Sequence, residues 1–405
     1  MDCIRCKGNA NSKFSCKRGF CPILQKFREA LPKVNLDFNG SSPPDVFVGQ
    51  FNYPNVFAGI LAPAQHDDTA SKLSAPEEWF KEHLGVHDIL QRRGSMIYSR
   101  FSSNIKSNND KLKEVMQEVS MAQKPCDMEF HLLKKPSLAM ELNNHSSPIG
   151  NPAPLKKAEI TENPFIPKKV DSVVSDNGLK SVEALTDLYK HEYSVTSMVK
   201  LLTAGLLGSK LERKMVPTRW AITAVDDIVS KDVLKKVKDY PWINEYRVYH
   251  DEYVGNHYEI ILLPRQWSYE VIEAKMPGSC WNTGMQIFFM KDNEGFYGRK
   301  SYASEVTGAY YSCRLAVAEH LDSIKRQASV LILREVRDEY FAPCGVGILR
   351  ETVRSAMSKH FEKFSTIEDA LKAASARLRI PINQFSESSV LLKEAKQQKT
   401  LLSFT

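Results

Sequence analysis

The chain has 405 residues, of which 42% are hydrophobic and 25% are charged, a composition typical of a soluble globular protein with two or three folded units. It contains no run of eighteen apolar residues and does not begin with an apolar signal peptide, so we expect a cytoplasmic protein without a membrane span. The net charge of +7 permits contact with a nucleic acid but does not require it.

Four of the eight cysteines, Cys3, Cys6, Cys16 and Cys21, lie at the start of the chain. Their C-x2-C-x9-C-x4-C spacing is typical of thiolates that converge on one tetrahedral Zn²⁺. The loop between the two pairs is polar, so metal ligation would supply most of its folding free energy. Incidental clustering and a redox-active C-x-x-C pair are the alternatives, but two preceding residues leave no room for the strand that a redox motif needs. We predict a structural zinc site and leave open whether it contacts nucleic acid.

Helical and strand patterns alternate after the cysteines. A helix is predicted over 22–33, followed by paired strands within 42–63 that meet at a turn over 52–55. A second helix is predicted over 74–85, with Ser74 as its cap.

The stretch 104–181 differs in composition from its flanks. Lysine, asparagine, serine and proline dominate it, which predicts a surface loop or linker. Helical periodicity returns after it. Further along, we expect a short strand that turns at Asp226 and Asp227 into a helix.

The rest of the body mixes strands with helices. A β-hairpin with its turn at 254–256 is predicted, then a helix over 302–324 and a buried strand over 327–336. Further helices follow, the last over 366–380. The irregular order predicts an α/β or α+β fold of mixed sheet layers and helices, with a small N-terminal zinc knuckle and a flexible C-terminal tail.

These patterns divide the chain into five predicted segments. They are the zinc motif (1–30), an N-terminal α+β part of the body (31–103), a polar insertion or linker (104–181), the main α/β body (182–390) and the tail (391–405).

The tail ends in QQKTLLSFT, which fits the peptide that docks on DNA sliding clamps, Q-x-x-(L/I/M)-x-x-aromatic-aromatic. Gln398, Leu401 and Phe404 occupy the three matching positions, and Thr405 replaces the second aromatic residue. A 3₁₀ turn would place the aliphatic and aromatic side chains in one hydrophobic pocket. The alternative is a frayed terminus with a few apolar residues.

The densest candidate site for an anion or nucleotide lies within 334–354. Glycines before a helix allow backbone N–H groups to approach a phosphate, and arginines one turn apart could add bidentate contacts. The spacing matches no established phosphate-binding loop, so the alternative is an ordinary glycine turn beside solvated charges. The residues concerned are Arg334, Arg337, Gly345, Gly347, Arg350 and Arg354.

Two smaller sets also suggest chemistry. Arg219 and Trp220 precede the Asp226–Asp227 pair, whose carboxylates could hold a metal or act as acid and base. Tyr310 and Arg314 share a predicted helix, from which stacking on a base is conceivable. A salt bridge or a helix cap is the competing explanation for each set.

Several long phrases occur in one chain together with the cysteine head and the tail. They include FVGQFNYPNVFAG, VPTRWAITAVDDIVSKDVL, YEIILLPRQWSYEVIEA and GAYYSCRLAVAEHL. In combination the chain resembles the NreA family of archaeal DNA repair proteins, nearly from end to end.

The resemblance implies a four-cysteine zinc motif, a role in the repair of DNA damage and a C-terminal peptide that binds the sliding clamp PCNA. These features map onto Cys3, Cys6, Cys16 and Cys21, and onto Gln398, Leu401 and Phe404. Removal of ADP-ribose from modified nucleic acid is a further activity associated with the family. The resemblance assigns no catalytic residue for it.

The leading hypothesis is therefore a zinc-containing DNA repair factor at the nucleoid, recruited through a clamp-binding tail. An ADP-ribosyl hydrolase with Asp226 or Asp227 as acid and base is one alternative, and a non-enzymatic adaptor is another. Expected partners are PCNA, DNA and ADP-ribose or a related nucleotide.

Overall fold

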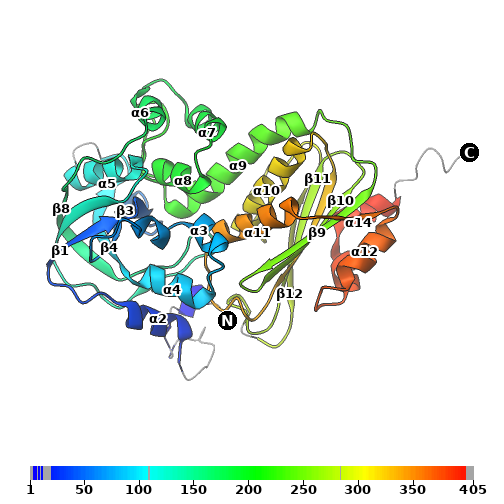
Figure 1. Ribbon diagram of the computed structural model, residues 1–405, viewed down its shortest axis with the longest axis horizontal. Coiled ribbons are helices and arrows are strands. Elements are labelled where there is room, and N and C mark those ends of the chain that lie inside the picture. The colour runs from blue at the N-terminus through cyan, green and yellow to red at the C-terminus, as the bar shows by residue number, and fades with distance from the viewer. Residues whose placement is uncertain are drawn as a thin grey trace, which may run out of the picture. The chain divides into compact units, whose positions relative to one another are not determined.

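The computed structural model describes residues 3–6, 8–9, 11, 20–107, 110–282 and 284–397 (Figure 1). The chain forms two compact units. Unit 1 comprises Met1–Val229 with Ala342–Ile348, and unit 2 comprises Ser230–Phe341 with Leu349–Thr405. Each contains a six-stranded mixed sheet covered by helices, which confirms the predicted mixed α/β class. In the described part of the chain, no helix is both long and apolar enough to cross a membrane.

The sheet of unit 1 has the order β1-β5-β8-β4-β3-β2. Its strands are β1 (Asp37–Ser42), β2 (Asp45–Val48), β3 (Asn55–Pro63), β4 (Met96–Asn104), β5 (Cys126–Leu132) and β8 (Pro152–Ile160). Only β4 and β8 pair in parallel, and the other neighbours are antiparallel. A small hairpin, β6 (Met140–Glu141) and β7 (Ile149–Gly150), lies outside this sheet.

The helical elements of unit 1 are mostly short. They are α1 (Cys3–Cys6), α2 (Pro22–Ala30), η1 (Ala70–Leu73), α3 (Pro76–Lys81), α4 (Val86–Gly94), α5 (Lys111–Met121), α6 (Lys168–Ser175), α7 (Ser181–Lys190) and α8 (Val195–Thr203). The predicted helices over 22–33 and 74–85 are confirmed as α2 and α3. Ser74 does not cap α3, however, because the N-cap is Ala75, and the Ser74 hydroxyl donates to Asp45 instead.

The strand predicted before Asp226 is wrong. Residues from both units form one continuous helix there, α9 (Thr218–Val237). Its β-branched residues resemble a strand, but Ala221, Val225, Val229, Val233 and Val237 recur every four residues and are all buried. This helical spacing decides the local structure, because it presents one apolar stripe to the interior.

The linker predicted over 104–181 is also wrong for the described residues. This stretch supplies α5, β5, β8 and α6, and β5 alternates buried and half-buried residues, as a strand with one face toward the core does. Lys111, Lys156 and Lys157 are exposed on these elements, whereas Lys113 and Ser120 on α5 are buried. The polar composition of this stretch therefore gave no indication that it supplies β5 and β8, two interior strands of the unit 1 sheet.

The sheet of unit 2 has the order β12-β11-β13-β10-β9-β14. Its strands are β9 (Tyr246–Tyr253), β10 (Asn256–Leu263), β11 (Ser268–Lys275), β12 (Phe288–Glu294), β13 (Ser329–Val336) and β14 (Glu362–Phe364). The predicted hairpin is confirmed as β9 and β10. Its turn holds Val254 at φ 44° and Gly255 at φ 76°, and paired positive φ values suit the twist of two antiparallel strands.

Helices cover both faces of the unit 2 sheet. They are α10 (Gly308–Ser323), α11 (Val346–Ser358, which begins in unit 1), α12 (Ile367–Ser375), α13 (Ile382–Ser388) and α14 (Val390–Gln397). The helices predicted within 302–324 and 366–380 are confirmed as α10 and α12, and the buried strand is β13, all of whose residues are buried. Figure 1 shows α12 and α14 beside one face of the sheet and α10 beside the other.

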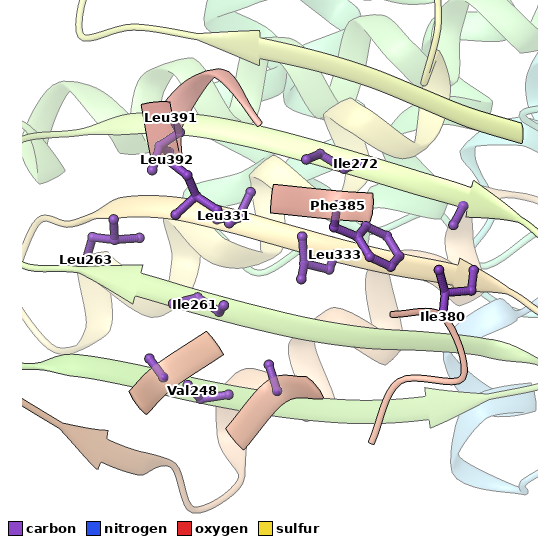
Figure 2. Packing of buried hydrophobic residues seen from close by; sticks show 13 residues of the cluster. Val248, Ile261, Leu263, Ile272, Leu331, Leu333, Ile380, Phe385, Leu391 and Leu392 are labelled. Atoms are coloured by element: carbon purple, nitrogen blue, oxygen red, sulfur yellow. The ribbon is translucent and has the colours of Figure 1, made fainter. Parts of the chain in front are cut away.

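The C-terminal helices pack on one face of this sheet, and the core between them and the strands is an apolar cluster (Figure 2). Strand residues such as Ile261, Ile272 and Leu331 meet Phe385 and Leu392 from the C-terminal helices. The burial of these side chains fixes α13 and α14 on unit 2, because removing apolar surface from water is the main stabilising contribution to such packing.

Candidate functional site

The cysteine-rich start of the chain, residues 3–21, is described at two places: around Cys6 and at Cys21. Cys3 and Cys6 are the first and last residues of α1. After Cys6 the chain turns through Gly8, at φ 79°, and the N–H of Asn9 donates to the Cys6 carbonyl at 2.9 Å. The side chain of Cys3 and the whole of Cys16 lie outside the described residues.

Cys21 caps α2 with its sulfur. The backbone N–H of Leu24 donates to the Cys21 Sγ at 3.5 Å. A Cβ atom on Gly8 would lie 3.0 Å from the Leu24 Cδ2, so the turn after Cys6 packs against the first turn of α2. The two described thiols therefore belong to neighbouring segments. Their chemistry fits Zn²⁺.

Among the side chains that the structure describes, no group of three or more metal-ligating residues occurs. The predicted four-thiol set includes Cys16 and the side chain of Cys3, so the complete set is not described.

The predicted tail (391–405) is wrong in its first seven residues, because residues 391–397 belong to a firmly anchored helix, α14. The Ser389 hydroxyl donates to Glu270 at 2.5 Å, and the N–H groups of Val390 and Leu391 donate to the same carboxylate at 2.9 and 3.0 Å. The anchored helix, α14, ends at Gln397. The predicted clamp-binding residues Gln398, Leu401 and Phe404 lie outside the described residues.

Asp226 and Asp227 lie inside α9 rather than at a strand end. Asp226 is buried and Asp227 is half-buried. Consecutive residues of a helix point about 100° apart, so their carboxylates do not face one point as those of a paired site would. Their role as acid and base stays a prediction.

Arg219, in the first turn of α9, interacts electrostatically with the buried side chain of His145. Burial and, secondly, the charge of Arg219 lower the pKa of His145 from 6.5 to about 3. His145 sits in a tight loop, where Asn143 Oδ1 accepts the N–H groups of both His145 and Ser146 at 2.8 Å. His145 is therefore neutral at pH 7.

The predicted glycine turn packs against this same loop. The N–H of Val346 donates to the His145 carbonyl at 2.8 Å, and Ser147 Oγ donates to the Cys344 carbonyl at 2.9 Å. A Cβ on Gly345, which has φ 89°, would lie 2.6 Å from the Ser147 nitrogen, and one on Gly347 would lie 2.7 Å from Pro76. Both glycines thus permit close approach of protein atoms, which supports the ordinary-turn explanation.

Three of the predicted arginines lie in the interior of unit 2. Arg314 donates to Glu294 at 2.8 Å and to Ser230. Arg334 pairs with Glu273 and donates to Asn256 at 2.5 Å. Arg337 pairs with Glu335 at 2.7 Å and also with Glu252. Each arginine is at most 5% exposed, so these pairs hold the sheet and its helices together.

Tyr310, Arg350 and Arg354, three more of the predicted ligand-binding residues, also make contacts within the fold. Tyr310 is fully buried, and burial raises its pKa well above 10. Arg350 is buried on α11, and Arg354 forms ion pairs with Glu319 at 2.6 Å and Glu351 at 2.8 Å. Ion pairs and packing therefore account for the contacts described for these residues, while ligand binding by them stays a prediction.

The sequence interpretation named Trp220 but did not group it with three other exposed aromatic side chains. Phe51, Tyr53, Phe57 and Trp220 are 61%, 42%, 43% and 45% exposed. The rings of Tyr53 and Trp220 lie 5.2 Å apart, and the Arg100 guanidinium lies 4.3 Å from the centre of the Phe57 ring. A usable signal was present, because residues 46–66 carry Phe51, Tyr53 and Phe57 without a single acidic residue.

Comparisons with known proteins cover nearly the whole chain. Residues 15–282 match the family described as Archaeal Nre, N-terminal, and residues 294–404 match Archaeal Nre, C-terminal. DNA repair protein NreB of Archaeoglobus fulgidus is 39% identical over 404 residues, 100% of each chain. DNA repair protein NreA of Haloferax volcanii is 35% identical over 87% of this chain and 86% of its own, and NreA of A. fulgidus is 35% identical over 93% of each.

No solved structure matches the chain. The two family descriptions nevertheless cover both units of the structure, and the relatives align over most of their own length. The chain belongs to the archaeal Nre family.

Proposed function

We propose that this protein acts in the repair of DNA damage and is recruited to the sliding clamp PCNA by its C-terminal peptide. The proposed repair function is supported by the 39% identity over the full chain to a relative named as a DNA repair protein. At this level of identity over the full length, the two proteins share a fold.

The recruitment proposal is supported by the way the chain leaves unit 2. Glu270 and the apolar cluster hold α14, whose Leu391 and Leu392 are 5% and 3% exposed. The Q-x-x-L-x-x-F sequence starts at Gln398, the residue directly after this helix. A docking peptide beside a fixed helix can enter a pocket on a partner without unfolding the body, which lowers the free-energy cost of binding.

A genetic test separates the two parts of the proposal. Cells that lack the gene should lose viability after treatment with an alkylating agent, and the full chain should restore it. A chain without residues 398–405 should restore less. Full restoration by the truncated chain would contradict recruitment through the tail, and unchanged survival of the deletion strain would contradict the repair function itself.

We also propose that Cys3, Cys6, Cys16 and Cys21 hold one structural zinc ion. Support comes from the neighbouring positions of the Cys6 turn and the Cys21 cap, and from the N–H group that Leu24 directs at sulfur. Four thiolates leave no open position, so the ion would stabilise the fold rather than catalyse a reaction.

Metal analysis tests the zinc proposal. The protein should contain about one zinc per chain, and Cys21→Ser should lose it. Cys126→Ala is the matched control, because Cys126 is buried in β5 and should leave the zinc content unchanged. Equal zinc content in the two variants would contradict the assignment.

The alternative function, hydrolysis of an ADP-ribosyl adduct, has weaker support. Its candidate arginines Arg314, Arg334 and Arg337 are engaged in buried ion pairs, where a ligand would have to displace glutamates. Separating one partner from such a pair costs several kcal/mol, on the order of 3–5. We therefore favour the recruited repair factor, located at the nucleoid, over the hydrolase.

A further inference from the structure

We propose that unit 1 binds single-stranded DNA on an exposed aromatic surface. The aromatic surface consists of Phe51, Tyr53, Phe57 and Trp220, which come from the turn between β2 and β3, from β3 and from the first turn of α9. This inference rests on the proposed role in DNA repair, and it names the ligand and the place where it binds.

Several hydrogen bonds bring these segments together. Val48 N donates to Thr218 Oγ1 at 2.9 Å, which ties the end of β2 to the start of α9. Ile105 N donates to the Pro54 carbonyl at 3.0 Å, and Met215 N donates to the Ile105 carbonyl at 3.0 Å. The turn, the end of β4 and the approach to α9 therefore form one continuous region of unit 1.

The outer face of β3 and β4 extends the aromatic surface. Phe57 lies opposite Ser102, and Asn55 lies opposite Asn104, whose amide donates to it at 2.8 Å. All four side chains are exposed. The Arg100 guanidinium lies over the Phe57 ring, and a flat base can stack on an aromatic ring or on a guanidinium plane.

The charge of this region suits a phosphate backbone. The segments 46–66, 96–107 and 213–225 contain no aspartate or glutamate. They contribute Arg100 and Arg219, which are half-buried, and the exposed Lys106 and Lys214. Positive groups without competing carboxylates attract phosphates, and the Arg100 guanidinium is already held over the Phe57 ring.

Another surface feature of unit 1 is less suited to DNA. An open groove of about 950 Å³ lies between α5 and the end of β8. Its charged lining residues are four glutamates and three lysines: Glu114, Glu118, Glu159, Glu162, Lys111, Lys156 and Lys157. The carboxylates beside these lysines weaken the attraction of the groove for phosphates.

The ligand is single-stranded because the faces of its bases must be free. In a duplex each base is stacked between its neighbours, whereas unpaired bases can stack on exposed Phe, Tyr and Trp rings. Such stacking tolerates any base sequence. We therefore expect binding with little sequence preference and a strong dependence on salt.

Fluorescence anisotropy with a labelled fifteen-nucleotide oligo(dT) tests the proposal. Phe57→Ala and Trp220→Ala should each raise the Kd at least fivefold, the lower end of what a lost base stack costs. Phe165→Ala is the matched control in the same unit, since its ring is 53% exposed and carries the Lys124 ammonium at 5.1 Å. It should leave the Kd unchanged.

Two further measurements make the test specific. Arg100→Gln should reduce the salt dependence of binding by about one phosphate contact. Oligo(dT) should quench tryptophan fluorescence in the native protein and quench it less in Trp220→Phe. Circular dichroism of each variant confirms that it is folded.

The proposal is overturned if oligo(dT) does not bind, if duplex or oligo(rU) binds more tightly than oligo(dT), or if Phe165→Ala weakens binding as much as Trp220→Ala. Clamp binding should be unchanged in the aromatic variants. Failure of DNA binding with intact clamp binding would therefore remove this inference and leave the proposed recruitment standing.

Discussion

The buried carboxylate of Glu270 accepts a hydrogen bond from the hydroxyl of Ser389, 119 residues further along the chain, at 2.5 Å. Glu270 lies on β11, and Ser389 directly precedes α14. Because the carboxylate also accepts two backbone N–H groups of α14, it neutralises the positive end of that helix. The last described helix, after which the clamp-binding sequence begins, is thereby fixed to the sheet of unit 2.

Glu270→Gln should destabilise unit 2. The amide can accept fewer hydrogen bonds than the carboxylate and directs an NH₂ group at backbone donors, so we expect a loss of about 2 kcal/mol in the free energy of unfolding. Urea denaturation measures it. Glu394→Gln, at an exposed site on α14, is the matched control and should change stability by less than about 0.5 kcal/mol. Equal effects would show that Glu270 does not hold the helix.

Gly345→Ala should be more harmful than Gly298→Ala. Both glycines have positive φ, 89° and 78°, which costs a side chain about 1 kcal/mol. A Cβ on Gly345 also meets the Ser147 backbone at 2.6 Å, whereas one on Gly298 meets nothing within 4 Å. We expect a total loss of about 2–4 kcal/mol at Gly345, measured by urea denaturation. Equal losses would mean that the glycine turn does not pack against loop 143–147 as described.

Stability should fall as the pH is lowered from about 6.5 toward 3. His145 has a folded pKa of about 3, below the 6.5 of an unperturbed histidine, so in this range the unfolded state binds more protons than the folded state. The free energy of unfolding then decreases by up to about 1.4 kcal/mol per pH unit from this group.

Replacement of His145 by asparagine should make the pH dependence shallower, whatever its effect on absolute stability. Denaturation curves between pH 4 and 7 provide the comparison. The slope should not vanish, because His320, whose pKa is lowered to about 4 by burial and by Arg247, contributes in the same direction. A slope identical to that of the native protein would contradict the buried neutral state of His145.

Local patterns predicted much of the fold. The hairpin of β9 and β10 was found because strand alternation surrounds a turn at Val254 and Gly255, and β13 was found because its apolar run is uninterrupted. The start of α9 was misjudged, because its β-branched residues favour a strand locally and the stripe ending at Val237 becomes visible only over the whole helix.

The roles of the charged residues were harder to predict. Arg334 looked available for a ligand, yet its partner Glu273 lies 61 residues away on a neighbouring strand. Pairings set by sheet order cannot be read from local sequence. The aromatic surface was missed for the same reason, since Tyr53 and Trp220 meet only in the folded chain.

Calorimetric titration of an archaeal sliding clamp with this protein tests the proposed recruitment most directly. The native chain should bind, and Phe404→Ala should raise the Kd at least tenfold, because the ring would fill the hydrophobic pocket of the clamp. Lys399→Ala, at a variable position of the same peptide, should bind like the native chain. Native affinity in Phe404→Ala, or equal loss in both variants, would contradict recruitment through this peptide.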